Sequence, residues 1–347
     1  MKASKSSIRL MASPFSLENR EKLSQIQTIV TLFAALYSLD EIPKGQLRRR
    51  EIVMRAPAPT VLVVGATGRF AGLVVPELIR RNASVRALIR DPENAEKARR
   101  LGASEVVTGN LRNPQSLENA VEGVDGVFHI GPAFAPDEAC MGVAMVEAAA
   151  RAGVRKFAFS SVIQPTNTRL ENHASKVPVE DALYSTNMEY TILHPANFMQ
   201  NIAAAWPSVV RDGVFSEPFP KTAKLARVDY RDVAEVAAIA LTEARLSYAT
   251  LELCADGMHS QEEIASMMSE ELGRPLSAGE PTFGEWAENA RLPYDDRQLQ
   301  LLAKVHDHYA KYGLGGNSLT LRAALGREPR SLRSFIRELA LQTAQIA

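Results

Sequence analysis

A glycine-rich segment carries the strongest chemical signal in the sequence. GATGRFAG (residues 65–72) stands between an apolar run at 61–64 and a helical pattern. Glycines there let the chain turn sharply and bring backbone N–H groups close to a pyrophosphate, while the start of the following helix attracts the anion. The alanine in place of a third glycine is still small enough for close helix packing. The segment predicts a dinucleotide site, and a purely structural tight turn is the alternative.

The end of the next expected strand indicates which dinucleotide binds. In NAD sites an acidic residue about 20 residues further on holds the ribose 2′-hydroxyl. Here the strand ends at Arg90, with no acid at its tip. A guanidinium can pair bidentately with a 2′-phosphate, whereas Asp91-Pro92 is typical of a helix N-cap followed by proline. The sequence favours NADP(H) over NAD(H), and a solvated strand-end charge is the alternative for Arg90.

A parallel sheet is needed to position these residues. From Thr60 onward, apolar runs without polar alternation alternate with helical patterns. Such runs are typical of strands buried on both faces, and repeated βαβ units predict a doubly wound α/β sheet of the Rossmann type. Strands are expected at Val61–Val64, Val85–Ile89, Glu105–Thr108, Gly126–Ile130, Lys156–Ser160, Thr191–Leu193, Leu225–Val228 and Thr250–Cys254, with helices at Ala71–Arg81, Pro92–Leu101, Pro114–Val121, Glu138–Ala152 and Arg231–Ala244.

The C-terminal part of the chain is expected to be mostly helical. Asp232 is expected to cap the helix that begins at Arg231. After Met258 helices are expected at Gln261–Leu272, Phe283–Ala290, Asp296–Tyr312, Leu319–Leu325 and Ser331–Gln345. We therefore predict a smaller helical substrate region, residues 221–347, interleaved with a Rossmann domain at 58–220.

Residues 1–57 are predicted to be an N-terminal extension that ends in a stiff Ala-Pro linker. Its first 55 residues hold ten Lys or Arg and five Asp or Glu, and its first 17 lack any acid. A transit peptide has such a composition. We favour a helix at 16–38 followed by a basic linker, or a later translation start at Met11 or Met54.

The composition limits the class of protein. Among 347 residues, 40 Lys plus Arg balance 40 Asp plus Glu, which leaves no basic footprint for nucleic acid. The apolar run at 26–39 is too short and too polar to span a bilayer. Cys140 and Cys254 have no metal-ligand spacing and suit a reducing compartment. We therefore expect a cytoplasmic protein without metal, nucleic-acid or membrane partners, and monomer and homodimer remain open.

Several segments resemble the NmrA-like atypical short-chain dehydrogenases. They are GATGRFAG (65–72), VRALIRDP (85–92), GNLRNPQSL (109–117), AGVRKFAFSSV (152–162), HASK (173–176), TILHPANFMQN (191–201) and LGREPRSLRSFIREL (325–339). The resemblance extends from Thr60 to Leu339 and is specific for the family but weak for substrate. That family includes NADPH-dependent quinone and dye reductases, and also regulators that bind NADP(H) without known turnover.

The resemblance implies roles for individual residues. Arg90 would hold the 2′-phosphate, and Lys176 would reach the nicotinamide ribose. The turn at the pyrophosphate would comprise Gly65, Ala66, Thr67, Gly68, Arg69 and Phe70; the adenine would meet Asn110 and Leu111; the ribose and pyrophosphate would pass near Ile130, Gly131 and Pro132; the nicotinamide end would be lined by Pro195, Ala196, Asn197 and Phe198.

The catalytic machinery departs from that of the tyrosine-dependent enzymes. Their YxxxK pair uses a tyrosine to protonate a carbonyl, but Asn172 stands four residues before Lys176. Ser161, at the end of a strand, can still donate a hydrogen bond, and His173 can act as an acid near neutral pH. A packed or capping role is the alternative for this histidine. His194 stands where the family commonly has arginine before the proline.

These features favour an NADPH-dependent reductase whose substrate needs little acid help, such as a quinone, a dye or another electron-poor conjugated molecule. A non-catalytic NADP(H) sensor is the alternative, and a ketone reductase with His173 or a pocket tyrosine as its acid is a third hypothesis. Trp206, Phe198 and Phe134 would line an aromatic substrate pocket or pack in a core.

Overall fold

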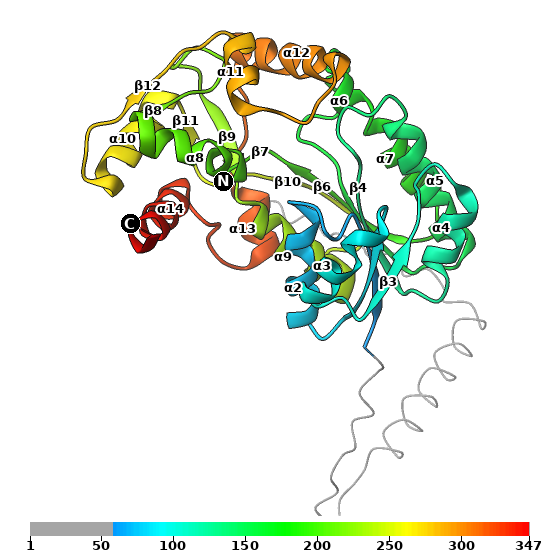
Figure 1. Ribbon diagram of the computed structural model, residues 1–347. Helices are drawn as coiled ribbons and strands as arrows, with labels where there is room; N and C mark the ends of the chain where they lie inside the picture. The colour runs from blue at the N-terminus through cyan, green and yellow to red at the C-terminus, as the bar shows by residue number, and fades with distance from the viewer. Residues whose placement is uncertain (1–57, 347) are drawn as a thin grey trace, which may run out of the picture. The chain divides into compact units, whose positions relative to one another are not determined.

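A seven-stranded parallel sheet lies at the centre of the structure, a computed structural model that describes residues 58–346 (Figure 1). Its strand order is β10-β6-β5-β4-β1-β2-β3, and each neighbouring pair is parallel. The strands are β1 (Thr60–Val64), β2 (Ser84–Ile89), β3 (Glu105–Thr108), β4 (Gly126–Ile130), β5 (Lys156–Ser160), β6 (Glu189–Pro195) and β10 (Ala249–Leu253). This order is that of a doubly wound sheet, as the alternating pattern predicts.

Helices cover both faces of the sheet, which explains why its strands lack polar alternation. Val61 and Val63 belong to one core and Leu62 and Val64 to the other, each at most 4% exposed. The first core is completed by α2 (Val74–Arg80), α3 (Ala95–Arg100), α9 (Tyr230–Thr242) and α13 (Leu319–Leu325), and the second by α4 (Pro114–Val121), α5 (Glu138–Arg151) and α7 (Val177–Tyr184).

A further layer packs beyond the carboxyl ends of the strands. Leu301 and Val305 of α12 (Asp296–Tyr312) share a buried cluster with Phe134, Ile163 and Ala196, which follow β4, β5 and β6. The helix thus roofs these three strand ends, beside α6 (Glu171–Ala174) in Figure 1. A separate apolar cluster joins α8 (Gln200–Asp212), α10 (Gln261–Leu272) and α14 (Leu332–Ile346), and α11 (Phe283–Ala290) precedes α12.

Short strands complete this layer. β7 (Asn197–Phe198), β9 (Leu225–Val228) and β11 (Met258–His259) form one small sheet, and β8 (Val214–Phe215) pairs with β12 (Ser277–Ala278). Because β10 lies beyond residue 220 and still joins the central sheet, the C-terminal region is interleaved with the sheet. The division of the chain into domains at that point stays a prediction.

Several local expectations need correction. The helix expected at Ala71–Arg81 begins as a 3₁₀ turn, η1 (Ala71–Leu73), before α2. Asp229, not Asp232, caps α9. Asp232 is fully buried and accepts hydrogen bonds from the Arg327 and Arg330 side chains, because it faces the C-terminal segment. The helix α8 was not expected at all.

Two expectations concern membranes and the N-terminal part. The helix expected at 16–38 and the basic linker lie outside the described residues. Within 58–346, no helix is both long and apolar enough to cross a membrane.

Candidate functional site

The predicted site residues gather at one edge of the sheet. Gly65 follows β1, Arg90 follows β2, Gly131 follows β4 and Ser161 follows β5, so the parallel strands bring them to a common edge. The other predicted cofactor residues share this edge: Asn110 and Leu111 after β3, Ile130 and Pro132 around the end of β4, and Pro195, Ala196, Asn197 and Phe198 around the end of β6. Dinucleotides bind at this edge, where strand order reverses between β1 and β4.

The glycine turn has the shape that a phosphate site requires. Gly65 has a φ of +68°, and a Cβ at Gly68 would lie 3.0 Å from the Gly65 carbonyl oxygen. Larger residues would therefore strain or block the turn. The backbone N–H groups of Thr67, Arg69 and Phe70 donate to no acceptor within the described part of the chain. Unpaired N–H groups at such a turn are suited to bind an anion.

Arg90 extends from the end of β2 into solvent. It is exposed and forms no ion pair with any residue between 58 and 346. The neighbouring Asp91 accepts a hydrogen bond from the Glu93 N–H at 3.0 Å and caps η2 (Pro92–Asn94), as predicted. In the loop after β3, Asn110 Oδ1 accepts from the Arg112 N–H at 2.9 Å. The free N–H groups and the unpaired guanidinium together fit a dinucleotide with a 2′-phosphate.

Lys176 is buried and bound to a carboxylate from another helix. Its ammonium donates to Glu138 Oε1, and the Ser175 hydroxyl donates to Oε2 of the same carboxylate at 3.2 Å. Lys176 and Glu138 are 7% and 3% exposed. Gly131 leaves room for this pair, because a Cβ there would lie 2.7 Å from Glu138 Oε1. Asn172 stands where the tyrosine would be, and an amide cannot act as an acid.

Ser161 belongs to a second buried polar cluster. Its hydroxyl donates to Glu180 Oε1, and His194 Nε2 lies 2.9 Å from that oxygen. Glu180 comes from α7 and His194 from β6, and all three residues are buried. Because the Ser161 proton is directed to Glu180, this hydroxyl is not free to donate to a substrate in the same arrangement.

Two further histidines near the strand ends, His173 and His129, have lowered pKa values. His173 Nδ1 lies 3.1 Å from the Gln164 carbonyl oxygen, and Nε2 lies 3.4 Å from the Tyr309 hydroxyl. Burial lowers the pKa of His173 below its ordinary value. His129 stacks on Phe159, and burial, with the Lys176 charge nearby, lowers its pKa to about 3. At pH 7 neither ring is therefore expected to be the imidazolium that acts as an acid.

Three aromatic rings pack together beside the glycine turn. Phe70 lies 4.6 Å from Phe198 and 5.0 Å from Tyr230, between ring centroids. The Tyr230 hydroxyl lies 2.9 Å from Ser160 Oγ, and burial raises the pKa of Tyr230. The rings form an apolar wall next to the predicted nicotinamide end.

Of the three predicted pocket aromatics, Trp206 is not at the strand ends. It is buried where α8, α10 and α14 meet, and its Nε1 donates to Thr343 at 2.8 Å. Phe134, after β4, packs edge-on against Tyr294 with ring centroids 5.8 Å apart. Phe198, which is only partly buried, thus stays a candidate for a substrate wall, whereas Phe134 and Trp206, both 7% exposed, pack in cores.

The sequence reasoning missed both carboxylates that hold the candidate catalytic groups. Glu180 follows Lys176 by four residues and precedes the buried Leu183 by three, so the three share one face of α7 and its N-terminal turn. A charged residue on an apolar helical face signals a buried partner. Glu138 has no such signal, because its partner comes from a distant segment.

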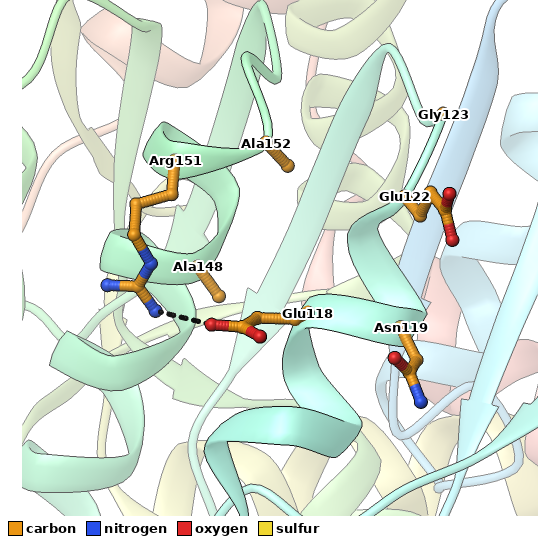
Figure 2. Close-up of a pocket in the computed structure, with 7 residues that line it drawn as sticks. All are labelled: Glu118, Asn119, Glu122, Gly123, Ala148, Arg151 and Ala152. Atoms are coloured by element: carbon orange, nitrogen blue, oxygen red, sulfur yellow. Dashed lines mark ion pairs between the residues drawn. The ribbon is translucent and has the colours of Figure 1, made fainter.

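A pocket at the opposite edge of the sheet is separate from this site. It lies where α4 and α5 end, near the amino ends of β4 and β5, and is lined by Glu118, Asn119, Glu122, Gly123, Ala148, Arg151 and Ala152 (Figure 2). Arg151 and Glu118 form an exposed ion pair at 3.5 Å there. Since dinucleotides bind at the carboxyl ends of the strands, this pocket takes no part in the candidate site.

The family of the chain follows from a comparison with models of protein families. Residues 57–334 match the model of the NmrA-like family. The chain belongs to the NmrA-like family. This confirms the resemblance predicted from the motifs, and the Rossmann-type sheet is confirmed by the strand order. Within the described residues, no three His, Cys, Asp or Glu side chains are grouped to hold a metal ion.

Two relatives with similar sequences are reductases. NAD(P)H azoreductase of Xenophilus azovorans is 33% identical over 227 residues, which cover 62% of this chain and 75% of the azoreductase. Quinone oxidoreductase 2 of Escherichia coli K12 is 24% identical over 286 residues, 80% of this chain and 98% of that protein.

Solved structures agree on the fold of the family. The NADPH-dependent quinone oxidoreductase of Escherichia coli, in complex with NADPH, superposes with a TM-score of 0.70 at 22% identity over 80% of this chain and 99% of its own. NmrA, a negative transcriptional regulator in complex with NADP, superposes with a TM-score of 0.66 at 18% identity over 84% of this chain and 98% of its own. At these identities the likeness is one of fold.

Proposed function

We propose that this protein is an NADPH-dependent reductase that passes hydride to a quinone, a dye or another electron-poor conjugated molecule. The azoreductase and quinone oxidoreductase among its relatives support this substrate class. The observation that carries the proposal is the commitment of Lys176 to Glu138 and of Ser161 to Glu180. Groups that would assist protonation of a ketone are thus engaged elsewhere, which suits an acceptor that needs no enzyme acid.

NADP(H) is the cofactor we propose for the strand-end site. The N–H groups of Thr67, Arg69 and Phe70 would hold its pyrophosphate, and Arg90 its 2′-phosphate. When bound, NADPH supplies the hydride. The relatives crystallised with NADPH and NADP support this choice.

The chain's own residues would orient the reactants and exclude water. Phe70 and Phe198, which are partly buried and pack on the fully buried Tyr230, offer an apolar surface at the proposed nicotinamide end, and α12 covers the ends of β4 to β6. Held there, a planar acceptor meets the nicotinamide in a fixed geometry. Hydride addition to a quinone leaves an aromatic oxyanion, which water protonates. No tyrosine is then required.

Deuteride transfer tests the proposal. NADPH labelled with deuterium at the nicotinamide carbon is incubated with the protein and a panel of quinones, azo dyes and enones. We expect quinone-dependent oxidation of NADPH and, with the enones, deuterium in the product. If no product carried deuterium and no acceptor in the panel caused oxidation of NADPH, the proposed reductase function would be contradicted.

A non-catalytic NADP(H) sensor is the second candidate function. The likeness to the regulator NmrA in complex with NADP favours it, and the same commitment of Lys176 and Ser161 is compatible with it. A sensor would bind NADP and NADPH, transfer no deuteride, and capture a protein partner with only one redox form.

A further inference from the structure

The side chain of Arg69 leaves the glycine turn and reaches the layer above it. Its guanidinium donates to the carbonyl of Gln200, the first residue of α8, and lies 5.4 Å from the centroid of the Phe70 ring. Burial lowers the pKa of this guanidinium, and the Tyr294 phenol, just before α12, raises it. Arg69 thus lies beside the partly buried ring of Phe70, at the carboxyl ends of the strands.

Most other cations around this edge already have a carboxylate. Arg227 pairs with Glu217, Arg297 with Glu171, Lys176 with Glu138 and Arg112 with Asp137. Arg69, by contrast, forms no ion pair with a residue in the range 58–346. Arg69 is exposed, and the protein atoms around its guanidinium lower the pKa of this group. An exposed guanidinium that lacks a counter-ion and lies beside an aromatic ring is suited to bind an anion.

We propose that Arg69 binds the anionic substituent of an aromatic substrate, so that the preferred acceptors are quinones or dyes that carry a sulfonate or a carboxylate. The ring of Phe70 would contact the aromatic part of the substrate, and the guanidinium its acidic group. This inference rests on the proposed function, because it assigns a substrate class to the same site.

The pyrophosphate of the cofactor is the other possible source of an anion at Arg69. Both ligands offer anionic oxygens, and the backbone N–H of Arg69 is proposed to face the pyrophosphate. The two assignments predict different kinetics. A guanidinium that binds the substrate controls the choice between charged and uncharged acceptors, whereas one that binds only the cofactor changes the KM for NADPH equally with every acceptor.

Steady-state kinetics with a naphthoquinone and its sulfonate separate these assignments. The readout is the ratio of kcat/KM for the sulfonate to kcat/KM for the parent quinone, which cancels effects on the cofactor. We expect Arg69→Gln to lower this ratio about fivefold, and Arg69→Lys, which keeps the charge, to restore most of it. Added salt should lower the ratio in the unmodified protein but not in Arg69→Gln.

Arg112→Gln is the matched control. Arg112 is a cation at the same edge whose guanidinium is already bound by Asp137 at 2.8 Å, so its loss should leave the ratio within about twofold. An unchanged ratio in Arg69→Gln, with a raised KM for NADPH for both acceptors, overturns the inference in favour of the pyrophosphate.

Ligand binding keeps the inference testable if no acceptor is reduced. Absence of turnover would contradict the proposed reductase function but not the anion site at Arg69. In that case a fluorescent naphthalenesulfonate is titrated into the NADP-loaded protein. Binding that weakens about fivefold in Arg69→Gln and is retained in Arg69→Lys supports the anion site, and equal affinity in all three proteins overturns it.

Discussion

The two halves of the candidate site are built differently. At the nucleotide half, around the ends of β1 to β3, Arg90 is exposed and the N–H groups of the turn are unpaired within the described residues. At the nicotinamide half, around the ends of β4 to β6, the candidate catalytic side chains of Lys176 and Ser161 are buried and already paired with the carboxylates of Glu138 and Glu180. The first half exposes its groups to a ligand, whereas the second is part of the folded core. Changes in the first should therefore alter affinity, and changes in the second should alter stability.

Glu138→Ala should have the largest effect of the variants proposed here, and the quantity affected should be the free energy of unfolding. It leaves the Lys176 ammonium buried without a counter-ion, because that side chain is only 7% exposed. Removal of one partner from a buried pair lowers the free energy of unfolding by about 3 kcal/mol. Urea denaturation followed by circular dichroism measures the change.

The exposed pair at the opposite edge provides the control. Glu118→Ala breaks the 3.5 Å contact with Arg151 (Figure 2) and should cost less than about 1 kcal/mol, since solvent screens exposed pairs. The double variant Glu138→Met with Lys176→Met removes both charges and should recover much of the loss. A cost for Glu138→Ala no larger than that for Glu118→Ala would contradict the assignment of the nicotinamide half to the core.

Arg90→Ala tests the nucleotide half. If the guanidinium binds the 2′-phosphate, its loss should weaken NADPH binding about 30-fold, which corresponds to about 2 kcal/mol for a charge-assisted pair. NADH has no 2′-phosphate, so its affinity should change little. Fluorescence titration of both cofactors gives the two values, and stability should stay near that of the unmodified protein because Arg90 is exposed. Equal weakening of NADH would argue against this role.

The nucleotide half was predictable because its signals are local. Gly65 needs a positive φ, Asp91 precedes a proline and caps a short helix, and Arg90 ends a strand. Each of these depends on a few neighbouring residues, and the parallel sheet that unites them follows from the alternation of strands and helices.

The nicotinamide half was only partly predictable, because its contacts join distant segments. Lys176 and Ser161 were identified through motifs, but Glu138 and Glu180, which bind them, were not. Glu138 lies 38 positions from Lys176, and no spacing rule links them. The sequence assigned Arg69 only to the pyrophosphate turn. The bond of its side chain to the first residue of α8 was not predictable, because it depends on how α8 packs above the sheet.

Ser161→Ala should have a smaller effect than Glu138→Ala or Arg90→Ala. The hydroxyl donates to Glu180 rather than to a substrate, so we expect kcat/KM for a naphthoquinone to fall less than about threefold. An enzyme that uses this serine to polarise a carbonyl would lose about a hundredfold. Ser160→Ala, which loses the bond to Tyr230 at 2.9 Å, is the neighbouring control on the same strand.

His173→Gln should have the smallest effect, and it bears on the hypothesis of a histidine acid. Burial lowers the pKa of His173 below its ordinary value of about 6.5, so the ring is already neutral at pH 7, and an acid role would fade as the pH rises from there. We expect the pH dependence of kcat/KM for quinone reduction, between about pH 6.5 and 8.5, to be the same in the unmodified protein and in the variant. Glutamine can still donate to the Gln164 carbonyl that now lies 3.1 Å from the imidazole, which keeps the fold comparable. A fall in rate with rising pH that vanishes in the variant would instead make His173 the proton donor and the protein a ketone reductase.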